Sequence, residues 1–380
     1  MKIAGIICEY NPFHNGHKYQ IELAKATHDA VVCIMSGSFV QRGGAAIYDK
    51  WTRAHAALCS GADLVIELPV RYCLSSAQGF ARGAVETLDS AGIIDTLVFG
   101  SESGDIQKLL HAADILLHEP AAVSAEIKRL VSDGMGYAAA REYAYSDVID
   151  NSLLSSPNNL LAIEYISSLM RIGSKIRPMT HIRTVGYHDS ECEDIYASAT
   201  FVREKIKKSE NFSYLVPYDY SEHEKYDINC LSDIFRYRMI TEKERLFCDI
   251  SDVEQGLEHR FLKASQCNTI DEIVDFVSNK RHTKARIRRI IASSLLNLHG
   301  GYRPPEYVRV LGMNEIGAKI LGDMRKKCCL PIINKTADFD MPMLREDILA
   351  TNVAALCADK TVLQNRDFLN SPVIIKTLRK

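Results

Sequence analysis

The chain has 380 residues, of which 47% are hydrophobic and 25% charged, and its formal net charge is -2. This is the composition of a globular protein with a sizeable core, and the length allows two domains. No apolar run approaches the length that spans a bilayer, and the run before Glu9 is too short for a signal peptide. Because the net charge is slightly negative, the chain as a whole does not attract nucleic acids. Any nucleic-acid contact must therefore come from a local basic patch.

The cysteines point to a reducing compartment. There are 11 of them, an odd number, scattered without a Cys-x-x-Cys pair. Free thiols of this kind are typical of cytoplasmic proteins. We therefore expect a cytoplasmic protein, with neither a membrane nor DNA as a partner.

Short apolar runs alternate with helical segments over the first hundred residues. Strands are predicted at 3–8, 30–35, 63–68 and 93–99, and helices between them, for example at 50–59 and 77–90. Continuous apolar strands that alternate with helices predict an α/β fold with a parallel sheet covered on both faces. Ligands of such sheets bind at the carboxyl ends of the strands.

The pattern turns helical after about residue 105. A helix is predicted to begin at Pro157, and a fifth strand to lie near Ile176 to Val185. From residue 232 to about 294 the chain reads as helices, with a further strand only at 307–311. Composition shifts near 208–225. We therefore divide the chain into a catalytic domain, 1–208, and a mainly helical domain, 209–380.

Two histidines open the first helix. His14 and His17 follow the first predicted strand, and Gly16 lies between them where a side chain would obstruct a phosphate. Backbone N–H groups at a helix N-terminus lack partners, and the helix dipole favours negative charge. The motif predicts a site that holds nucleotide phosphates and stabilises charge at the α-phosphorus. Ordinary surface histidines or zinc-binding histidines are the alternatives. Zinc would need further Cys or His ligands at short spacing, and none lie nearby in the sequence, so no metal site is expected.

A second phosphate-binding signal is the stretch Ser198-Ala199-Thr200-Phe201-Val202-Arg203. Its hydroxyls and its guanidinium lie on the first turn of a predicted helix, where they are suited to meet phosphate oxygens. Taken alone, the stretch fits an ordinary helix cap with a solvated arginine better. Facing the two histidines, it would clamp a triphosphate from the other side.

Together these two motifs resemble those of the nucleotidylyltransferase superfamily, Rossmann-like enzymes that cleave ATP between the α- and β-phosphates. The wider pattern is similar to the bacterial tRNA(Met) cytidine acetate ligase family. It comprises residues 9–17 (EYNPFHNGH), 35–37 (MSG), 39–43 (FVQRG), 63–69 (DLVIELP), 99–102 (FGSE) and 156–159 (SPNN). The resemblance spans nearly the whole chain and is densest before residue 105. Gly44-Ala45-Ala46 departs mildly from the family pattern.

The resemblance implies a Rossmann-like α/β nucleotidyltransferase domain followed by a mainly α-helical, tRNA-binding domain. Such enzymes activate acetate with ATP as acetyl-adenylate. They then transfer the acetyl group to N4 of the wobble cytidine, position 34, of elongator tRNA(Met). ATP with Mg²⁺ is thus the expected co-substrate, and acetate and this tRNA are the expected partners. His14, His17 and Arg203 are the expected catalytic residues.

The resemblance also implies where ATP binds: the first strand-turn-helix, a glycine after the fourth strand, an asparagine and an arginine. The arginine is carried over to Arg183, although Arg177 lies close by. With the two hydroxyls of the second motif, the predicted ATP-binding residues are Ile7, Cys8, Glu9, Tyr10, Asn11, Pro12, Phe13, His14, Asn15, Gly16, His17, Lys18, Tyr19, Gln20, Gly100, Asn159, Arg183, Ser198 and Thr200.

Residues 280–289 are rich in positive charge, and apolar residues follow at helical spacing, so one face can pack while another presents charge. We expect the cations to bind tRNA phosphates, which positions an RNA without reading its sequence. The alternative is a solvated helix balanced by Asp271, Glu272 and Asp275. The predicted RNA-binding residues are Lys280, Arg281, Lys284, Arg286, Arg288 and Arg289.

Other functions stay open at this point. An enzyme that adenylylates a small metabolite would not need the basic helix, and an RNA-binding protein without catalysis would not need both phosphate motifs. A class I aminoacyl-tRNA synthetase is disfavoured because no Lys-Met-Ser-Lys-like loop is present. The loop 36–44, with Gln41 and Arg42, is either a lid over ATP or acetate or a plain connection. The acid, acetate or a larger carboxylate, is not fixed by the sequence.

Overall fold

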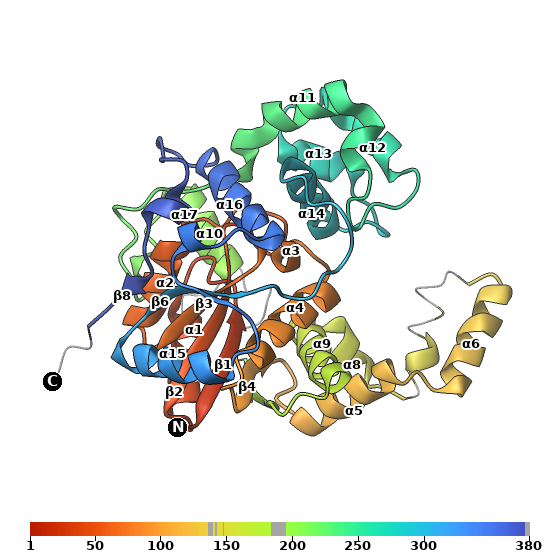
Figure 1. Ribbon diagram of the computed structural model, residues 1–380. Coiled ribbons are helices and arrows are strands. Elements are labelled where there is room, and N and C mark those ends of the chain that lie inside the picture. Colours follow the sequence, from red (N-terminus) through yellow and green to blue (C-terminus); the bar gives the residue numbers. More distant parts are fainter. Residues whose placement is uncertain (136–139, 141–142, 147, 184–194, 377–380) are drawn as a thin grey trace.

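The computed structural model is built around one eight-stranded sheet (Figure 1). It describes residues 1–135, 140, 143–146, 148–183 and 195–376. The strand order is β5-β4-β1-β2-β3-β6-β7, with β8 paired to β6. The strands are β1 (Ile3–Cys8), β2 (Ala30–Ser36), β3 (Leu64–Leu68), β4 (Thr96–Ser101), β5 (Arg177–Ile182), β6 (Val308–Met313), β7 (Ile332–Ile333) and β8 (Val373–Ile374).

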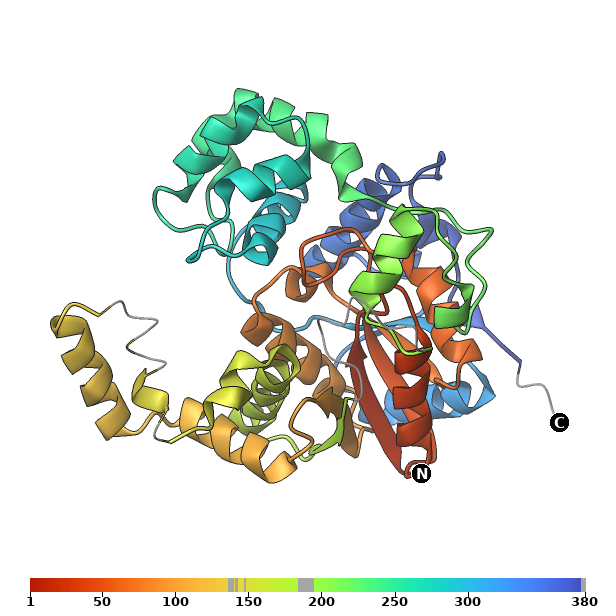
Figure 2. The ribbon, with the colours of Figure 1, turned by 180° about the vertical axis from the view of Figure 1, so that it is seen from behind.

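Helices cover both faces of this sheet and build a separate lobe (Figures 1 and 2). The first group is α1 (Asn15–Lys25), α2 (Lys50–Cys59), α3 (Val70–Cys73), α4 (Ala77–Ser90), α5 (Ile106–Leu117), α6 (Ala121–Ser132), α8 (Asn151–Ser155), α9 (Pro157–Ile172) and α10 (Ala199–Lys207). The lobe contains α11 (Ser232–Glu242), α12 (Leu257–Lys263), α13 (Ile270–Val277) and α14 (Lys284–Leu295). It is followed along the chain by α15 (Glu315–Lys327), which packs against the sheet, α16 (Pro342–Ala355) and α17 (Arg366–Leu369). None of the described helices is both long and apolar enough to cross a membrane.

The continuous apolar runs form strands because both faces of the sheet are buried. In β2, Val32 and Ile34 belong to the core under α4 and α9, while Val31 and Cys33 belong to the core under α1 and α2. The strands β5, β4, β1, β2 and β3 run parallel. The predicted parallel sheet with two covered faces is therefore confirmed.

The predicted boundaries hold closely for most elements. The helices at 50–59 and 77–90 are observed as α2 and α4, and the strand at 3–8 as β1. The fourth strand begins at Thr96 instead of at 93, because Ile93 and Ile94 pack into the core before the strand starts. The fifth strand is observed at Arg177–Ile182, and Thr184 and Val185 lie outside the described residues.

The second half of the chain returns to the sheet after building the helical lobe. Strand β6 pairs antiparallel with β3, and β7 and β8 extend the sheet beyond it. Residues from about 302 onward therefore complete the α/β unit, whereas the sequence analysis placed all of 209–380 in one mainly helical domain. A strand that follows a long helical segment carries no sequence signal of the sheet it joins.

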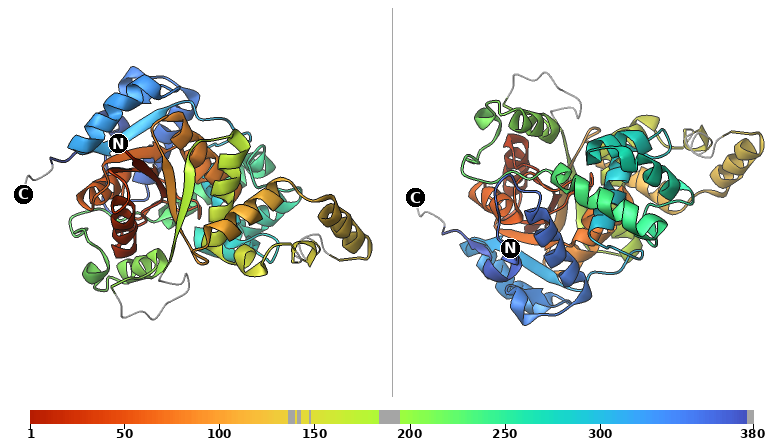
Figure 3. Two further views of the ribbon diagram at one scale, coloured as in Figure 1. Left: turned by 90° about the horizontal axis from the view of Figure 1, so that it is seen from below. Right: turned by 90° about the horizontal axis from the view of Figure 1, so that it is seen from above.

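The helical lobe packs around a second core cluster, which it shares with loops of the α/β unit. Buried side chains of α11 to α14, such as Phe235, Phe261 and Ile290, form one cluster with Phe39, Val70 and Leu74. These last three follow strands β2 and β3, so the lobe rests on the carboxyl-end side of the sheet. The views from below and above place it there too (Figure 3).

A buried group of four charges ties the last elements to the sheet. Lys50 Nζ lies 2.7 Å from a carboxylate oxygen of Glu67 and 2.7 Å from one of Asp367. Arg309 completes the group at 3.1 Å from Glu67 and 2.5 Å from Asp367. All four side chains are at most 5% exposed. Removal of one partner from such a buried group leaves an uncompensated charge, which is strongly destabilising.

Candidate active site

The two histidines lie at the point where the strand order of the sheet reverses. Strand β1 has β2 on one side and β4 on the other, so the loops that follow β1 and β4 leave the sheet in different directions. Crevices at such switch points are the usual ligand sites of open parallel sheets. The turn with His14 follows β1, and Gly100 lies near the end of β4.

His14 and His17 cap the first turn of α1 reciprocally. The backbone N–H of Gly16 donates to His14 Nδ1 at 3.1 Å, and the backbone N–H of His14 donates to His17 Nδ1 at 3.2 Å. The two rings stack with centroids 3.7 Å apart. A Cβ on Gly16 would lie 3.0 Å from the His14 ring, so a side chain there would displace the imidazole itself.

This capping fixes how each imidazole can act. Because Nδ1 accepts a hydrogen bond in both rings, the neutral form carries its proton on Nε2. Burial, with the nearby charges of Arg183 and Arg203, lowers the pKa of His14 to about 3. Burial, His14 and Arg183 lower the pKa of His17 well below its ordinary value. Two neutral rings therefore lie at the helix N-terminus, each with an Nε2–H donor that its capping hydrogen bond does not use.

The second phosphate motif lies beside the first. Arg203 Nη1 donates to the carbonyl of Asn11 at 2.6 Å, and its Nη2 donates to Thr200 Oγ1 at 3.0 Å. Ser198 caps α10 by accepting from the N–H of Phe201 at 3.2 Å. The structure thus brings Arg203 to the histidine turn, while both hydroxyls serve the helix cap and the arginine.

Arg183 also lies at this edge of the sheet. It follows β5, and its N–H donates to the Ser101 carbonyl at 3.0 Å. Its Cγ would lie 2.8 Å from a Cβ on Gly100, which explains why a glycine occupies that position. Arg177 pairs with Thr96 at the opposite end of β4. The geometry therefore favours Arg183 over Arg177 as the arginine of the site.

Asn159 is held by a carboxylate that the sequence analysis did not single out. Glu102 accepts from the N–H groups of Asn158 at 3.1 Å and Asn159 at 2.7 Å, and so caps α9. Asn159 Oδ1 accepts from the N–H of Ser103 at 3.0 Å, and its side chain is buried. Glu102 thereby joins the loop after β4 to the start of α9.

Several other predicted ATP-binding residues have structural partners. Asn11 Oδ1 accepts from Ile47 N at 2.7 Å, and Asn15 Nδ2 donates to the Tyr214 carbonyl at 2.9 Å. Gln20 Nε2 lies 3.5 Å from the Val98 carbonyl. The others comprise Ile7, Cys8, Tyr10, Pro12 and Phe13 in or directly after β1, exposed Lys18, and Tyr19, whose ring contacts that of Tyr196.

Arg53 organises the loops of the site, and the sequence analysis missed it. Its guanidinium is fully buried and donates to the Glu9 carbonyl at 2.7 Å, the Ser36 carbonyl at 2.9 Å and the Gly37 carbonyl, while its Nε donates to the Tyr48 carbonyl at 2.9 Å. Five fixed donors suit one arginine to gather several carbonyls. A lone arginine within a helix offers no sequence signal for this role.

The loop after β2 is held by contacts with the end of β1 on one side and with α14 on the other. Gln41 N donates to Glu9 Oε1 at 2.6 Å, and burial raises the pKa of Glu9. Gly43 has φ +80°, and a Cβ there would lie closer than 3.0 Å to the backbone of Arg288 and Arg289 in α14. The loop therefore packs between the end of β1 and the helical lobe.

The predicted RNA-binding cations are largely paired with carboxylates. Arg286 and Arg281 contact Glu254 at 2.9 and 2.6 Å, and Lys284 contacts Asp275 at 2.6 Å. Arg288 contacts Asp271 at 2.8 Å, and nearly buried Arg289 contacts Asp252 at 2.7 Å. Asp271 and Asp275 thus balance the helix as the alternative interpretation described, whereas Glu272 accepts from the backbone N–H of Asn268 instead. Arg281 and Lys284 still expose 76% and 60% of their side chains.

Comparisons with known proteins show the family to which this chain belongs. A family model described as HIGH Nucleotidyl Transferase matches residues 1–367. A tRNA(Met) cytidine acetate ligase of Thermoanaerobacter sp. (strain X514) is 40% identical over 97% of this chain and 99% of its own length. One of Clostridium novyi (strain NT) is 38% identical over 99% of this chain and 100% of its own length. The chain belongs to the tRNA(Met) cytidine acetate ligase family.

A solved structure of this family has the same fold. TmcAL of Thermotoga maritima, crystallised with alpha-thio ATP, matches with a TM-score of 0.89 at 31% identity, over 99% of this chain and 100% of that chain. The resemblance stated from the motifs and the Rossmann-like fold are therefore confirmed. Among the described residues, no group of three His, Cys, Asp or Glu side chains is placed to hold a metal ion.

Proposed function

We propose that this protein activates acetate with ATP as acetyl-adenylate and transfers the acetyl group to N4 of the wobble cytidine of elongator tRNA(Met). The observation that carries the proposal is the meeting of His14, His17 and Arg203 at the switch point of the sheet. The relatives that share this chain's full length carry the ligase name, and the Thermotoga maritima protein binds an ATP analogue.

In the first step a carboxylate oxygen of acetate attacks the α-phosphorus in line, and pyrophosphate leaves. No protein nucleophile is needed, so catalysis rests on positioning and on stabilising phosphate charge. His14 and His17 each supply a neutral Nε2–H donor, and Arg203 and Arg183 supply positive charge beside them. In the second step the cytidine N4 attacks the acetyl carbon, and AMP leaves.

The proposed substrate is ATP in complex with Mg²⁺. Mg²⁺ usually keeps several waters and binds through phosphate oxygens with few protein ligands. The site described here offers imidazoles and guanidinium groups to the phosphates, and this fits that manner of binding. The described cysteines are all free thiols, which supports the cytoplasm as the place of action.

The tRNA contacts the exposed cations at the start of α14. Ion pairs between exposed side chains contribute only about 0–1 kcal/mol, so a phosphate can replace the carboxylate partners of Arg281 and Lys284. Replacing both with Ala should lower tRNA affinity and reduce the salt dependence of binding by about two charges. Acetate activation should be retained, and unchanged tRNA affinity would argue against this contact.

Acetate-dependent exchange of pyrophosphate into ATP tests the first step. His14→Ala and His17→Ala should each reduce exchange about 10²-fold, as loss of one such donor typically does. Glu22→Gln, an exposed change on the same helix, is the matched control. Incubation with ATP, labelled acetate and unmodified tRNA should yield N4-acetylcytidine. Exchange without any acetylated nucleoside would instead favour adenylylation of a small metabolite.

A further inference from the structure

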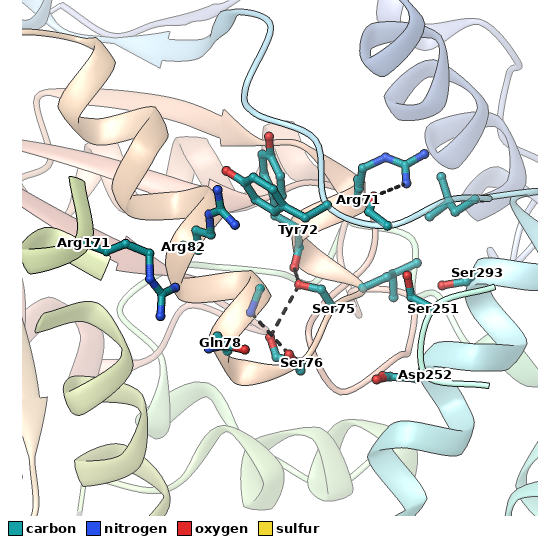
Figure 4. Close-up of a pocket in the computed structure, with 15 residues that line it drawn as sticks. Arg71, Tyr72, Ser75, Ser76, Gln78, Arg82, Arg171, Ser251, Asp252 and Ser293 are labelled. Atoms are coloured by element: carbon teal, nitrogen blue, oxygen red, sulfur yellow. Dashed lines mark hydrogen bonds between the residues drawn. The ribbon is translucent and has the colours of Figure 1, made fainter. Parts of the chain in front are cut away.

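A cleft of about 470 Å³ lies between the α/β unit and the helical lobe, apart from the histidine turn (Figure 4). One wall is formed by α3, α4 and the end of α9, and the opposite wall by residues of the lobe. The side chains that line both walls and carry chemistry are Ser75, Gln78, Arg82, Arg171, Asp252 and Ser293.

A flat cationic surface forms part of the first wall. The guanidinium of Arg82 stacks on the ring of Tyr302 with its carbon 3.6 Å from the ring centroid, and Glu86 holds it at 2.8 Å. The Tyr302 hydroxyl donates to the same carboxylate. The plane of Arg82 is thus immobilised with 37% of its side chain exposed. Arginine planes held in this way stack well on unpaired nucleobases.

A second cation lies beside this plane. Arg171, at the end of α9, is exposed and forms no ion pair with the residues that the structure describes. In Figure 4 its guanidinium extends into the space between Arg82 and Gln78. Gln78 is exposed as well, on the first turn of α4. A guanidinium without a carboxylate partner is suited to bind a phosphate.

The opposite wall offers polar groups that can meet the edge of a base. Asp252 and Ser293 come from the loop before α12 and from α14. Asp252 already accepts from Arg289 at 2.7 Å through one oxygen, Oδ2. The cleft thus combines a stacking plane, a free cation and hydrogen-bonding groups, which together match one nucleotide of a single-stranded RNA.

Gln41 connects the cleft to the active site through its backbone and its side chain. Gln41 N donates to Glu9, next to the histidine turn, and Gln41 Nε2 lies 3.4 Å from the Ser75 carbonyl at the cleft. We infer that this cleft binds an unpaired nucleotide of the substrate RNA close to the cytidine that is modified, with its base on Arg82 and its phosphate at Arg171. The inference rests on the proposed function, because it requires an RNA substrate.

Two variants test the two halves of this site. Arg82→Lys keeps the charge and the partner Glu86 but removes the plane, and Arg171→Ala removes the free cation. Each should raise the KM for unmodified tRNA about tenfold, the usual effect of losing one stacked base or one charged contact. Arg171→Ala should also reduce the salt dependence of tRNA binding by about one charge. Acetate-dependent pyrophosphate exchange should stay at the wild-type rate in both.

The matched control is Arg325→Ala, an exposed arginine of α15 that does not line the cleft. It should leave the KM for tRNA unchanged, and thermal unfolding should confirm that all three variants fold. Unchanged tRNA kinetics in Arg82→Lys and Arg171→Ala would overturn the inference. So would Arg171-dependent binding of free CMP or AMP without an effect on tRNA, since the cleft would then hold a free nucleotide. If the wild-type protein itself shows no acetate-dependent pyrophosphate exchange, the proposed function is overturned instead.

Discussion

Acidification tests whether His14 is held as a neutral imidazole. Burial lowers its pKa in the folded protein to about 3, whereas a histidine in an unfolded chain has a pKa of about 6.5. Above pH 6.5 both states are neutral, and the imidazole contributes nothing that depends on pH. Below pH 6.5 His14 is protonated in the unfolded chain but stays neutral in the folded protein. Stability therefore falls as the pH falls.

The size of the effect follows from this linkage. The free energy of unfolding should lose about 1.4 kcal/mol per pH unit, or about 2 kcal/mol between pH 6.5 and 5.0. His14→Asn isolates the contribution, because an asparagine side chain can still accept from the N–H of Gly16 and cap α1. The difference in unfolding free energy between wild type and variant should therefore shrink by about 2 kcal/mol over that range.

Urea unfolding of the ATP-free protein at several pH values between 5.0 and 7.5 measures this difference. His118→Asn, at an exposed histidine after α5, is the control for loss of a histidine as such. If the curves of wild type and His14→Asn stay parallel across the range, His14 is not buried as a neutral ring. The argument that it offers an Nε2–H donor to phosphate would then fail.

Three further changes have outcomes that the structure predicts. Arg53→Met leaves several buried carbonyls without donors, each at a cost of about 1–3 kcal/mol, so the urea midpoint should fall markedly; an unchanged midpoint contradicts its organising role. Gly43→Ala should lower the free energy of unfolding by about 1–3 kcal/mol, as measured by thermal unfolding. Gly44→Ala is the control and should leave it unchanged, because a Cβ at that position meets nothing within 4 Å. Equal melting temperatures would refute the tight packing on α14. Arg203→Lys loses the two-point hold on Asn11 and Thr200, so the KM for ATP should rise about tenfold with stability retained, and an unchanged KM would remove Arg203 from the site.

The sequence predicted what depends on local pattern. The buried strands β1 to β3 carry continuous apolar runs, and the motif around His14 and His17 indicates a helix start. Both the sheet and the histidine turn at its edge could therefore be predicted. The second motif was expected to face the two histidines only because a shared triphosphate would require it. The hydrogen bond from Arg203 to the Asn11 carbonyl shows how the structure brings Arg203 to that turn.

What the sequence missed are partnerships between distant residues. Arg53 donates to four carbonyls, Glu102 caps α9, and β6 pairs with β3. Each of these contacts joins segments that are distant in the sequence, and none of them produces a periodic pattern of residues. The carboxylates opposite the basic helix were partly anticipated, as Asp271 and Asp275, but Asp252 and Glu254 come from a loop whose position only the fold determines.

The buried group of Lys50, Glu67, Arg309 and Asp367 has a consequence for how the protein matures on the ribosome. Glu67 lies directly beneath Gly37, in the loop that leads from β2 to the active site. Its two cations and their second carboxylate come together only when Asp367 has been synthesised and has left the exit tunnel. The turn with His14 and His17 is thus among the first segments to emerge, yet its surroundings become complete almost at the end of translation. Nascent chains that stall before residue 367 should be poor ATP binders and good substrates for proteases.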